Sequence, residues 1–203
     1  VRERQNILIA GATSSGKTTL ANALLAEIAA TGDRVLVLED TVELQCAARD
    51  HVPLRTRQGV VSMTELVRSS MRLRPDRVVV GEVRGAEALD LIKVWGTGHP
   101  GGIATIHAGS ALGALLRLEQ LILEVAVNPP RALIAEAVNV VIHIAGRGRK
   151  RRIESIARVV GFDGVGYHLA DAMEASFPEL PPISDAAPAA VTSSSPDSLG
   201  ELP

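Results

Sequence analysis

The sequence has little cysteine, few aromatic side chains and no long apolar run. Its one cysteine, Cys46, excludes an internal disulfide framework and any zinc site built from paired cysteines, and it fits a reducing compartment. One Trp, one Tyr and two Phe are too few for the stacking surfaces that bind single-stranded nucleic acid. Because no stretch of about 18 apolar residues occurs, we predict no transmembrane segment and expect a cytoplasmic chain.

The charge is almost balanced, with 21 Lys and Arg against 23 Asp and Glu. This balance argues against a protein built mainly to neutralise phosphate backbones, so we expect no direct sequence-specific nucleic-acid binding. The 203 residues, 46% of them hydrophobic, are enough to bury a core without disulfides or a structural metal. We predict one domain over residues 1–175. A tail over residues 176–203, rich in Pro, Ser and Ala, is predicted to be disordered.

Short apolar runs alternate with helical patterns along most of the chain. Four buried strands are predicted, at residues 6–10, 34–38, 77–80 and 103–106. Helices are predicted between and after them, at residues 17–31, 63–73, 86–95 and from Ser110 onwards. This alternation indicates an α/β fold with a mostly parallel central sheet flanked by helices.

Three further regions carry weaker signals. Residues 52–57 are expected to form a short extended pair, and the leucine-rich face of residues 112–122 is expected to pack in the core. Residues 139–145 and 153–161 flank the basic run 147–152, which predicts an antiparallel hairpin, and a short strand is expected at 167–169. The basic run could contact anionic lipid or an acidic partner, but we favour a solvated hairpin tip without chemistry.

A complete phosphate-binding loop follows the first predicted strand and opens the first predicted helix. The segment matches G-x-x-x-x-G-K-[ST] and consists of Gly11, Ala12, Thr13, Ser14, Ser15, Gly16, Lys17 and Thr18, with Thr19 next to it. Its backbone N–H groups can surround a phosphate, and the helix N-terminus adds partial positive charge. We expect Lys17 to contact the β- and γ-phosphates and Thr18 to hold Mg²⁺. A turn that only joined strand to helix would have no use for this lysine and threonine.

Polar side chains stand at the ends of the other predicted strands. Glu39 ends the second strand, Glu82 follows the third, and His107 follows the fourth. Because parallel strands present their C-terminal ends to the ligand crevice, we expect these side chains to meet at the phosphate loop. Glu82 is the stronger candidate for a base or a metal-water ligand. Glu43 could equally be a solvated carboxylate, and His99 is only a possible neighbour of the site.

Four signatures in this order resemble those of the secretion ATPases of type IV secretion and conjugative transfer. These ATPases belong to a wider group that also drives type II secretion and pilus motors. The resemblance covers about residues 5–160. The signatures are the phosphate loop at 11–18, the acidic box at 38–44, the strand-end segment at 74–84 and the histidine box at 97–108.

The resemblance implies a RecA-like ATPase that hydrolyses ATP to ADP and phosphate with Mg²⁺. It also implies a homo-oligomer, a hexameric ring at the cytoplasmic face of the inner membrane that works with secretion or conjugation apparatus proteins. By the family pattern, Lys17 and Thr18 serve the phosphates and Mg²⁺, and Glu39 and Glu82 have catalytic or metal-water roles. His107 contacts the γ-phosphate.

The sequence departs from the family pattern in one respect. Family members carry an N-terminal domain, whereas here the first strand begins within six residues of Val1, so we expect a fragment. Such a fragment would hydrolyse ATP slowly if the missing domain supplies arginines to the phosphates, because an arginine finger contributes roughly 10³–10⁵ in rate. The single Cys46 excludes those type II members that carry a four-cysteine zinc site.

Several alternatives stay open from sequence alone. The nearest is a pilus assembly, pilus retraction or type II secretion ATPase. A nucleotide-binding interaction module without turnover belongs to another class. A small-molecule kinase is disfavoured because no lid insertion is evident, and a DNA helicase would need stimulation by single strands.

Overall fold

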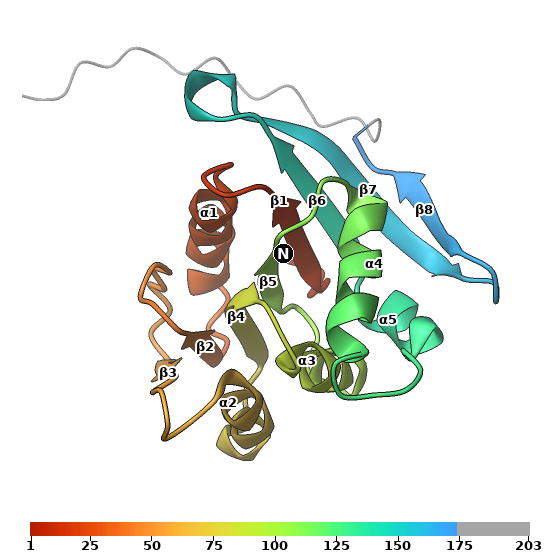
Figure 1. The fold of residues 1–203 in the computed structure, drawn as a ribbon. Coiled ribbons are helices and arrows are strands. Elements are labelled where there is room, and N and C mark those ends of the chain that lie inside the picture. The colour runs from red at the N-terminus through yellow and green to blue at the C-terminus, as the bar shows by residue number, and fades with distance from the viewer. Residues whose placement is uncertain (174–203) are drawn as a thin grey trace, which may run out of the picture.

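The computed structural model describes residues 1–173 (Figure 1). Within this range eight strands form one sheet in the order β3-β2-β4-β5-β1-β6-β7-β8. The strands are β1 (Ile7–Gly11), β2 (Val35–Glu39), β3 (His51–Arg55), β4 (Arg77–Val83), β5 (Ile103–Ile106), β6 (Val140–Ala145), β7 (Arg152–Phe162) and β8 (Tyr167–Asp171). The first six strands in this order, from β3 at the edge to β6, pair in parallel. Strand β7 pairs antiparallel with β6, and β8 pairs antiparallel with β7. The predicted α/β class is confirmed, and the predicted tail at 176–203 lies outside the described residues.

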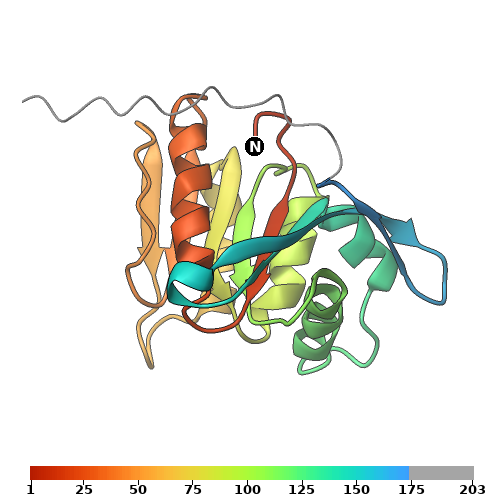
Figure 2. The same ribbon diagram turned by 90° about the horizontal axis from the view of Figure 1, so that it is seen from above.

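Helices cover both faces of the sheet (Figures 1 and 2). They are α1 (Lys17–Ala29), α2 (Met63–Ser70), α3 (Glu87–Gly96), α4 (Ala111–Ile122) and α5 (Arg131–Ala137), with 3-10 turns at Met71–Leu73 and Gly148–Lys150. Helix α1 lies on one face, and α2 to α5 pack against the other. None of the helices in residues 1–173 combines the length and the apolar character needed to cross a membrane.

Alternate side chains of the central strands pack in two separate cores. On β1, Ile7 and Ile9 pack with α1, whereas Leu8 and Ala10 pack with the helices on the opposite face. This division follows from the two-residue period of a strand. Strands buried on both faces are apolar throughout, which explains the uninterrupted runs in the sequence. Each fully buried Leu or Ile contributes about 1.5–3 kcal/mol.

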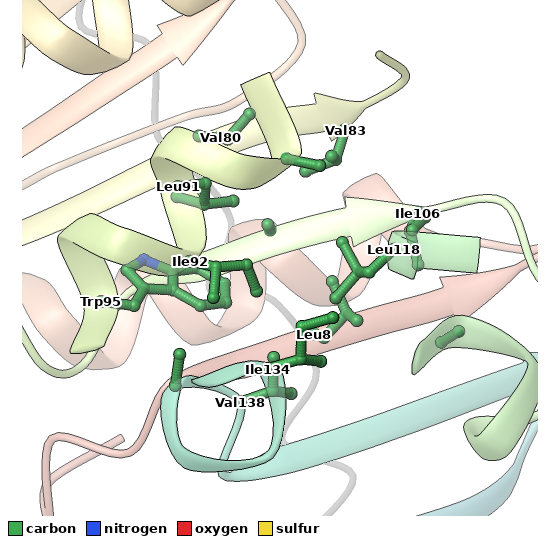
Figure 3. Close-up of a cluster of buried hydrophobic side chains, with 14 of the residues drawn as sticks. Leu8, Val80, Val83, Leu91, Ile92, Trp95, Ile106, Leu118, Ile134 and Val138 are labelled. Carbon is green, nitrogen blue, oxygen red and sulfur yellow. The ribbon is translucent and has the colours of Figure 1, made fainter. Parts of the chain in front are cut away.

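The larger core lies between the sheet and helices α3, α4 and α5 (Figure 3). It is built of large side chains that are almost entirely withdrawn from solvent, among them Leu8, Val80, Val83, Leu91, Ile92, Trp95, Ile106, Leu118, Ile134 and Val138. Two of the helices that contribute to it, α2 and α4, begin at side-chain caps. Ser62 and Glu65 form a capping box at α2, and the Ser110 hydroxyl accepts the Gly113 N–H at 2.9 Å at the start of α4.

Residues 51–61 differ from the prediction. Instead of a short extended pair, the chain forms β3, which extends the sheet by pairing in parallel with β2. Only a single antiparallel bridge, Arg57 to Val61, follows it. Pro53 lies within this strand, and it is tolerated there because β3 is an edge strand that need not donate on its outer side.

Two helical features also differ from expectation. Helix α5 was not predicted from sequence, although its Ile134 and Ala137 are buried against the sheet. On α4, Leu115 is fully buried as predicted, but Leu112 and Leu116 are 43% and 45% exposed. The apolar surface of α4 is therefore wider than the face that contacts the core, and the leucine pattern alone does not reveal which part is covered.

A buried ion pair fixes the edge of the sheet opposite the ends of the parallel strands. The Arg77 side chain, only 1% exposed, donates from Nε to Asp33 Oδ2 at 2.5 Å and from a terminal nitrogen to the Gly101 carbonyl at 3.1 Å. Burial opposes ionisation of Asp33, but hydrogen bonds from Arg77 and Thr31 outweigh it and hold the pKa of the Asp33 carboxyl below its ordinary value. The pair therefore stabilises the fold only while Asp33 is ionised.

We predict that Asp33→Ala lowers the free energy of unfolding by about 3 kcal/mol, because it leaves the Arg77 charge buried without its partner. The matched control is Asp50→Ala, which removes the exposed Arg34–Asp50 pair and should cost less than about 1 kcal/mol. Urea unfolding at neutral pH measures both. Equal losses in the two variants would contradict the assignment.

The same pair gives a pH dependence with a defined sign. Because the pKa of Asp33 is lower in the folded state, its contribution is complete above the unfolded-state value of about 4. The contribution is lost as the pH falls through the folded-state value. The difference between wild type and Asp33→Ala should therefore shrink in urea titrations below about pH 4.

Candidate active site

The phosphate loop leaves the end of β1 and returns as the first turn of α1. Ser14 and Gly16 have φ angles of 62° and 102°, and the left-handed conformation explains the glycine at position 16. No side chain caps α1. The first backbone N–H groups of a helix have no acceptor within it, so this N-terminus can bind an anion.

Lys17 lies inside the loop rather than in solvent. Its ammonium donates to the carbonyls of Gly11 and Ala12 at 3.0 and 3.1 Å. Burial lowers the pKa of Lys17, and the nearby carboxylates of Glu82 and Glu43 only partly offset this effect. A phosphate at the loop would supply the anionic partner that the buried ammonium has only at a distance.

The acidic box closes one side of the loop. Glu39, buried at the end of β2, accepts the backbone N–H groups of Glu43 and Leu44 through Oε1 at 3.0 and 2.8 Å. This holds Glu43 in place, and its Oε2 accepts the Thr18 hydroxyl at 3.0 Å. Glu43 is therefore not merely a solvated loop carboxylate. It contacts the hydroxyl predicted to hold Mg²⁺.

Glu82 and His107, which were predicted from separate strands, lie in direct contact. Oε1 of Glu82 is 2.5 Å from Nε2 of His107. An irregularity in the β4–β5 register between Val80 and Val83 accompanies this placement, and such a bulge turns a side chain toward a site. Oε2 of Glu82 accepts Nε of Arg84 at 2.5 Å. This hydrogen bond is the main cause that raises the pKa of the Arg84 guanidinium.

These groups line one cleft at the C-terminal ends of β1, β2, β4 and β5. The cleft contains every predicted side chain with a chemical role, and it is lined by Thr13, Ser14, Gly16, Lys17, Thr18, Thr19, Glu39, Asp40, Thr41, Glu43, Leu44, Gly81, Glu82, Arg84, Thr105, His107 and Arg151. Three loop residues do not line it: Gly11 and Ser15 are buried, and Ala12 is exposed outside it.

The structure decides two positions that the sequence left open or placed differently. His99 is not a neighbour of the site, because its Nδ1 lies 2.9 Å from the carbonyl of Pro75, before the start of β4 at the opposite edge of the sheet. Arg151 is not a purely solvated tip residue, because it lines the cleft beside Gly16. No local pattern singles out Arg151 within its basic run, since the hairpin register alone brings it to the loop.

The residues present fit Mg²⁺ bound with a nucleotide. Thr18 offers a hydroxyl, and Glu43 and Glu82 offer carboxylates within the same cleft. No group of three or more His, Cys, Asp or Glu side chains among residues 1–173 is arranged to hold a metal by itself. Mg²⁺ commonly binds through one or two side chains, substrate phosphates and water, so this sparse donor set suits it. The hydroxyl of Ser15, buried under the loop, has no hydrogen-bond partner within the described chain.

Comparison with known proteins identifies the class. Residues 1–155 match the family described as type II/IV secretion system protein, and the chain belongs to this family. It is 51% identical over 164 residues to the conjugal transfer protein TrbB of Rhizobium radiobacter, which covers 80% of this chain and 50% of that protein. It is 38% identical over 172 residues to the type IV secretion system protein PtlH of Bordetella pertussis, over 77% of this chain and 50% of that protein.

A solved structure supports the same assignment. The VirB11 ATPase of the Brucella suis type IV secretion system, in complex with sulphate, superimposes with a TM-score of 0.71 at 34% sequence identity. The match covers 77% of this chain and 49% of that one. The predicted secretion-ATPase fold is thus confirmed. The chain spans about half the length of the curated relatives it matches.

We predict that Lys17→Met weakens ATP binding by about 100-fold or more, because it removes a charged donor to the phosphates. The thermal unfolding midpoint should stay unchanged or rise. The lowered pKa means that the fold disfavours the charged amine at neutral pH, a penalty that falls as the pH rises above the folded-state pKa and disappears above the unfolded-state value of 10.5.

Calorimetric titration with ATP and thermal unfolding of the same sample measure the two effects of Lys17→Met. Lys93→Met removes an exposed lysine from α3 and serves as the control. Wild-type affinity in Lys17→Met, or a clearly lowered unfolding midpoint, would refute the role assigned to the buried amine.

Proposed function

We propose that this chain is the ATPase domain of a motor for type IV secretion or conjugative transfer, with residues 1–175 as a single RecA-like domain. Its reaction is the Mg²⁺-dependent hydrolysis of ATP to ADP and phosphate. The observation that carries the proposal is the contact between Glu82 and His107 opposite a complete phosphate loop. A pure binding module has no need of a carboxylate placed beside the γ-phosphate position.

In the proposed mechanism, water attacks the γ-phosphorus in line with the departing ADP. The N–H groups of the loop and the Lys17 ammonium bind the β- and γ-phosphates and stabilise the charge that develops on them. Thr18 and Glu82 would hold Mg²⁺, which would supply positive charge to the phosphate groups. The His107 imidazole, at the end of β5, contacts the γ-phosphate and orients Glu82.

Glu82 is the better candidate for the group that accepts the proton of the attacking water. The Oε1 atom of Glu39 already accepts two backbone N–H groups, so Glu39 acts mainly by holding the acidic box. Glu82 contacts side chains only, and one of them, Arg84, is 64% exposed. Release of Arg84 would leave Oε2 of Glu82 open to water.

Family membership supports a proposal for assembly and location. We propose a homo-oligomer, a hexameric ring, that acts at the cytoplasmic face of the inner membrane with proteins of the secretion or conjugation apparatus. Support comes from the similarity to TrbB, PtlH and VirB11, whose names refer to conjugal transfer and type IV secretion. The proposed ring rests on family membership and not on contacts within one chain.

We expect Glu82→Gln to reduce ATP turnover by about 100-fold or more, the usual contribution of a positioned general base. ATP binding should remain within about threefold of wild type, since the neutral amide keeps the shape of the side chain. Phosphate release and calorimetric binding are the two measurements, with the exposed Glu136→Gln as the control. Full turnover in Glu82→Gln would remove this residue from the essential groups.

We also expect the specific rate of phosphate release to rise with protein concentration, because subunits of a ring complete one another's sites. The assay spans a wide concentration range, with Lys17→Met as the blank. A constant rate above the blank would contradict assembly-dependent activity. A rate at the blank level despite ATP binding would favour a nucleotide-binding module without turnover.

A further inference from the structure

The hairpin of β6 and β7 holds its tip beside the phosphate loop. Strand β6 pairs in parallel with β1, with Gly11 opposite Ile144, so the root of the hairpin is fixed next to the start of the loop. Beyond it the turn is tight: Gly146 has a φ of 82°, and a Cβ there would overlap the Lys150 carbonyl. The tip lies beside the N-terminal end of α1 in both ribbon views (Figures 1 and 2).

Arg151 is the tip residue that reaches the cleft. Its Cδ lies 3.4 Å, and one terminal nitrogen 4.0 Å, from the position that a Cβ on Gly16 would take. Arg147, Arg149 and Lys150 are exposed and do not line the cleft. The chain thus places one member of its basic run over the phosphate loop, and a solvated tip does not explain that selection.

The Arg151 guanidinium has no ion-pair partner within residues 1–173. The neighbouring Arg152 pairs with Glu154 at 2.6 Å, and Arg84 across the cleft pairs with Glu82. A guanidinium at the rim of an anion site suits a phosphate, because its planar fork can donate two parallel hydrogen bonds.

The order of the strands indicates which phosphate of a nucleotide Arg151 would contact. The catalytic groups Glu39, Glu82 and His107 come from β2, β4 and β5, which lie on one side of β1. Strand β6 and its hairpin lie on the other side. A triphosphate chain is linear, so a γ-phosphate near the catalytic groups directs the α-phosphate toward the hairpin.

We infer that Arg151 is a nucleotide-binding residue that contacts the α-phosphate. This inference rests on the proposed function, because it takes the ligand to be a nucleoside di- or triphosphate with its γ end at Glu82. It assigns the two ends of the cleft different tasks. Lys17 and the strand-end groups recognise the phosphates that react, and Arg151 recognises the part of the nucleotide that leaves unchanged.

The test measures binding of ATP, ADP and pyrophosphate to the full chain by calorimetry. Arg151→Ala should weaken ATP and ADP binding by about tenfold, the value of one charged hydrogen bond. Pyrophosphate, which lacks an α-phosphate and a nucleoside, should lose less than about twofold. Arg151→Lys keeps the charge but not the planar fork, so its affinity for ATP and ADP should lie between those of wild type and Arg151→Ala.

Arg149→Ala is the matched control, because it removes an exposed arginine of the same turn that does not line the cleft. Wild-type ADP affinity in Arg151→Ala would overturn the inference and leave the proposed function standing. Equal losses in the Arg149 and Arg151 variants would also overturn it, since they would indicate a diffuse charge effect. A wild-type chain that binds neither ATP nor ADP would instead refute the proposed function itself. Unchanged thermal unfolding midpoints establish that the variants are folded.

Discussion

Strand β1 pairs in parallel with β5 and β6, and this pairing determines where the groups of the cleft meet. Parallel strands that are buried on both faces end at one edge of the sheet, and every chain segment that follows them starts from that edge. The phosphate loop after β1, Glu39 at the end of β2, Glu82 in β4 and His107 after β5 therefore meet without any insertion to carry them there. The packing of the two cores fixes this convergence, because a strand shifted by one residue would exchange its buried faces.

Most of the charged groups in the cleft have a contact within it. Glu82 lies between His107 and Arg84, and Glu43 accepts the Thr18 hydroxyl. The Lys17 ammonium donates to two loop carbonyls, although burial lowers its pKa. The Arg151 guanidinium has no ion-pair partner in the described part of the chain. A phosphate or Mg²⁺ in this cleft could replace the present partners of these groups.

The opposite edge of the sheet is built differently. There the Arg77 side chain is fully enclosed and donates to Asp33 and to the Gly101 carbonyl, and none of these groups lines the cleft. A buried pair of this kind is costly to break, so it ties the start of β4 to the segments around it. One end of β4 therefore carries a buried ion pair that stabilises the fold, and the other end carries a side chain of the candidate active site. Arg77 begins β4 in the core, and Glu82 near its end lines the cleft.

The α/β class, the phosphate loop and the strand-end groups Glu39, Glu82 and His107 could be predicted from sequence, because each depends on local pattern and on the direction of parallel strands. The sequence did not reveal that β3 with Pro53 is a parallel edge strand, or that Leu112 and Leu116 of α4 are exposed. It also left Glu43 ambiguous and assigned Arg151 no role. These points depend on the tertiary structure, because contacts such as Thr18 to Glu43 and Gly16 to Arg151 join residues far apart in the chain, and no local spacing encodes the register that brings them together.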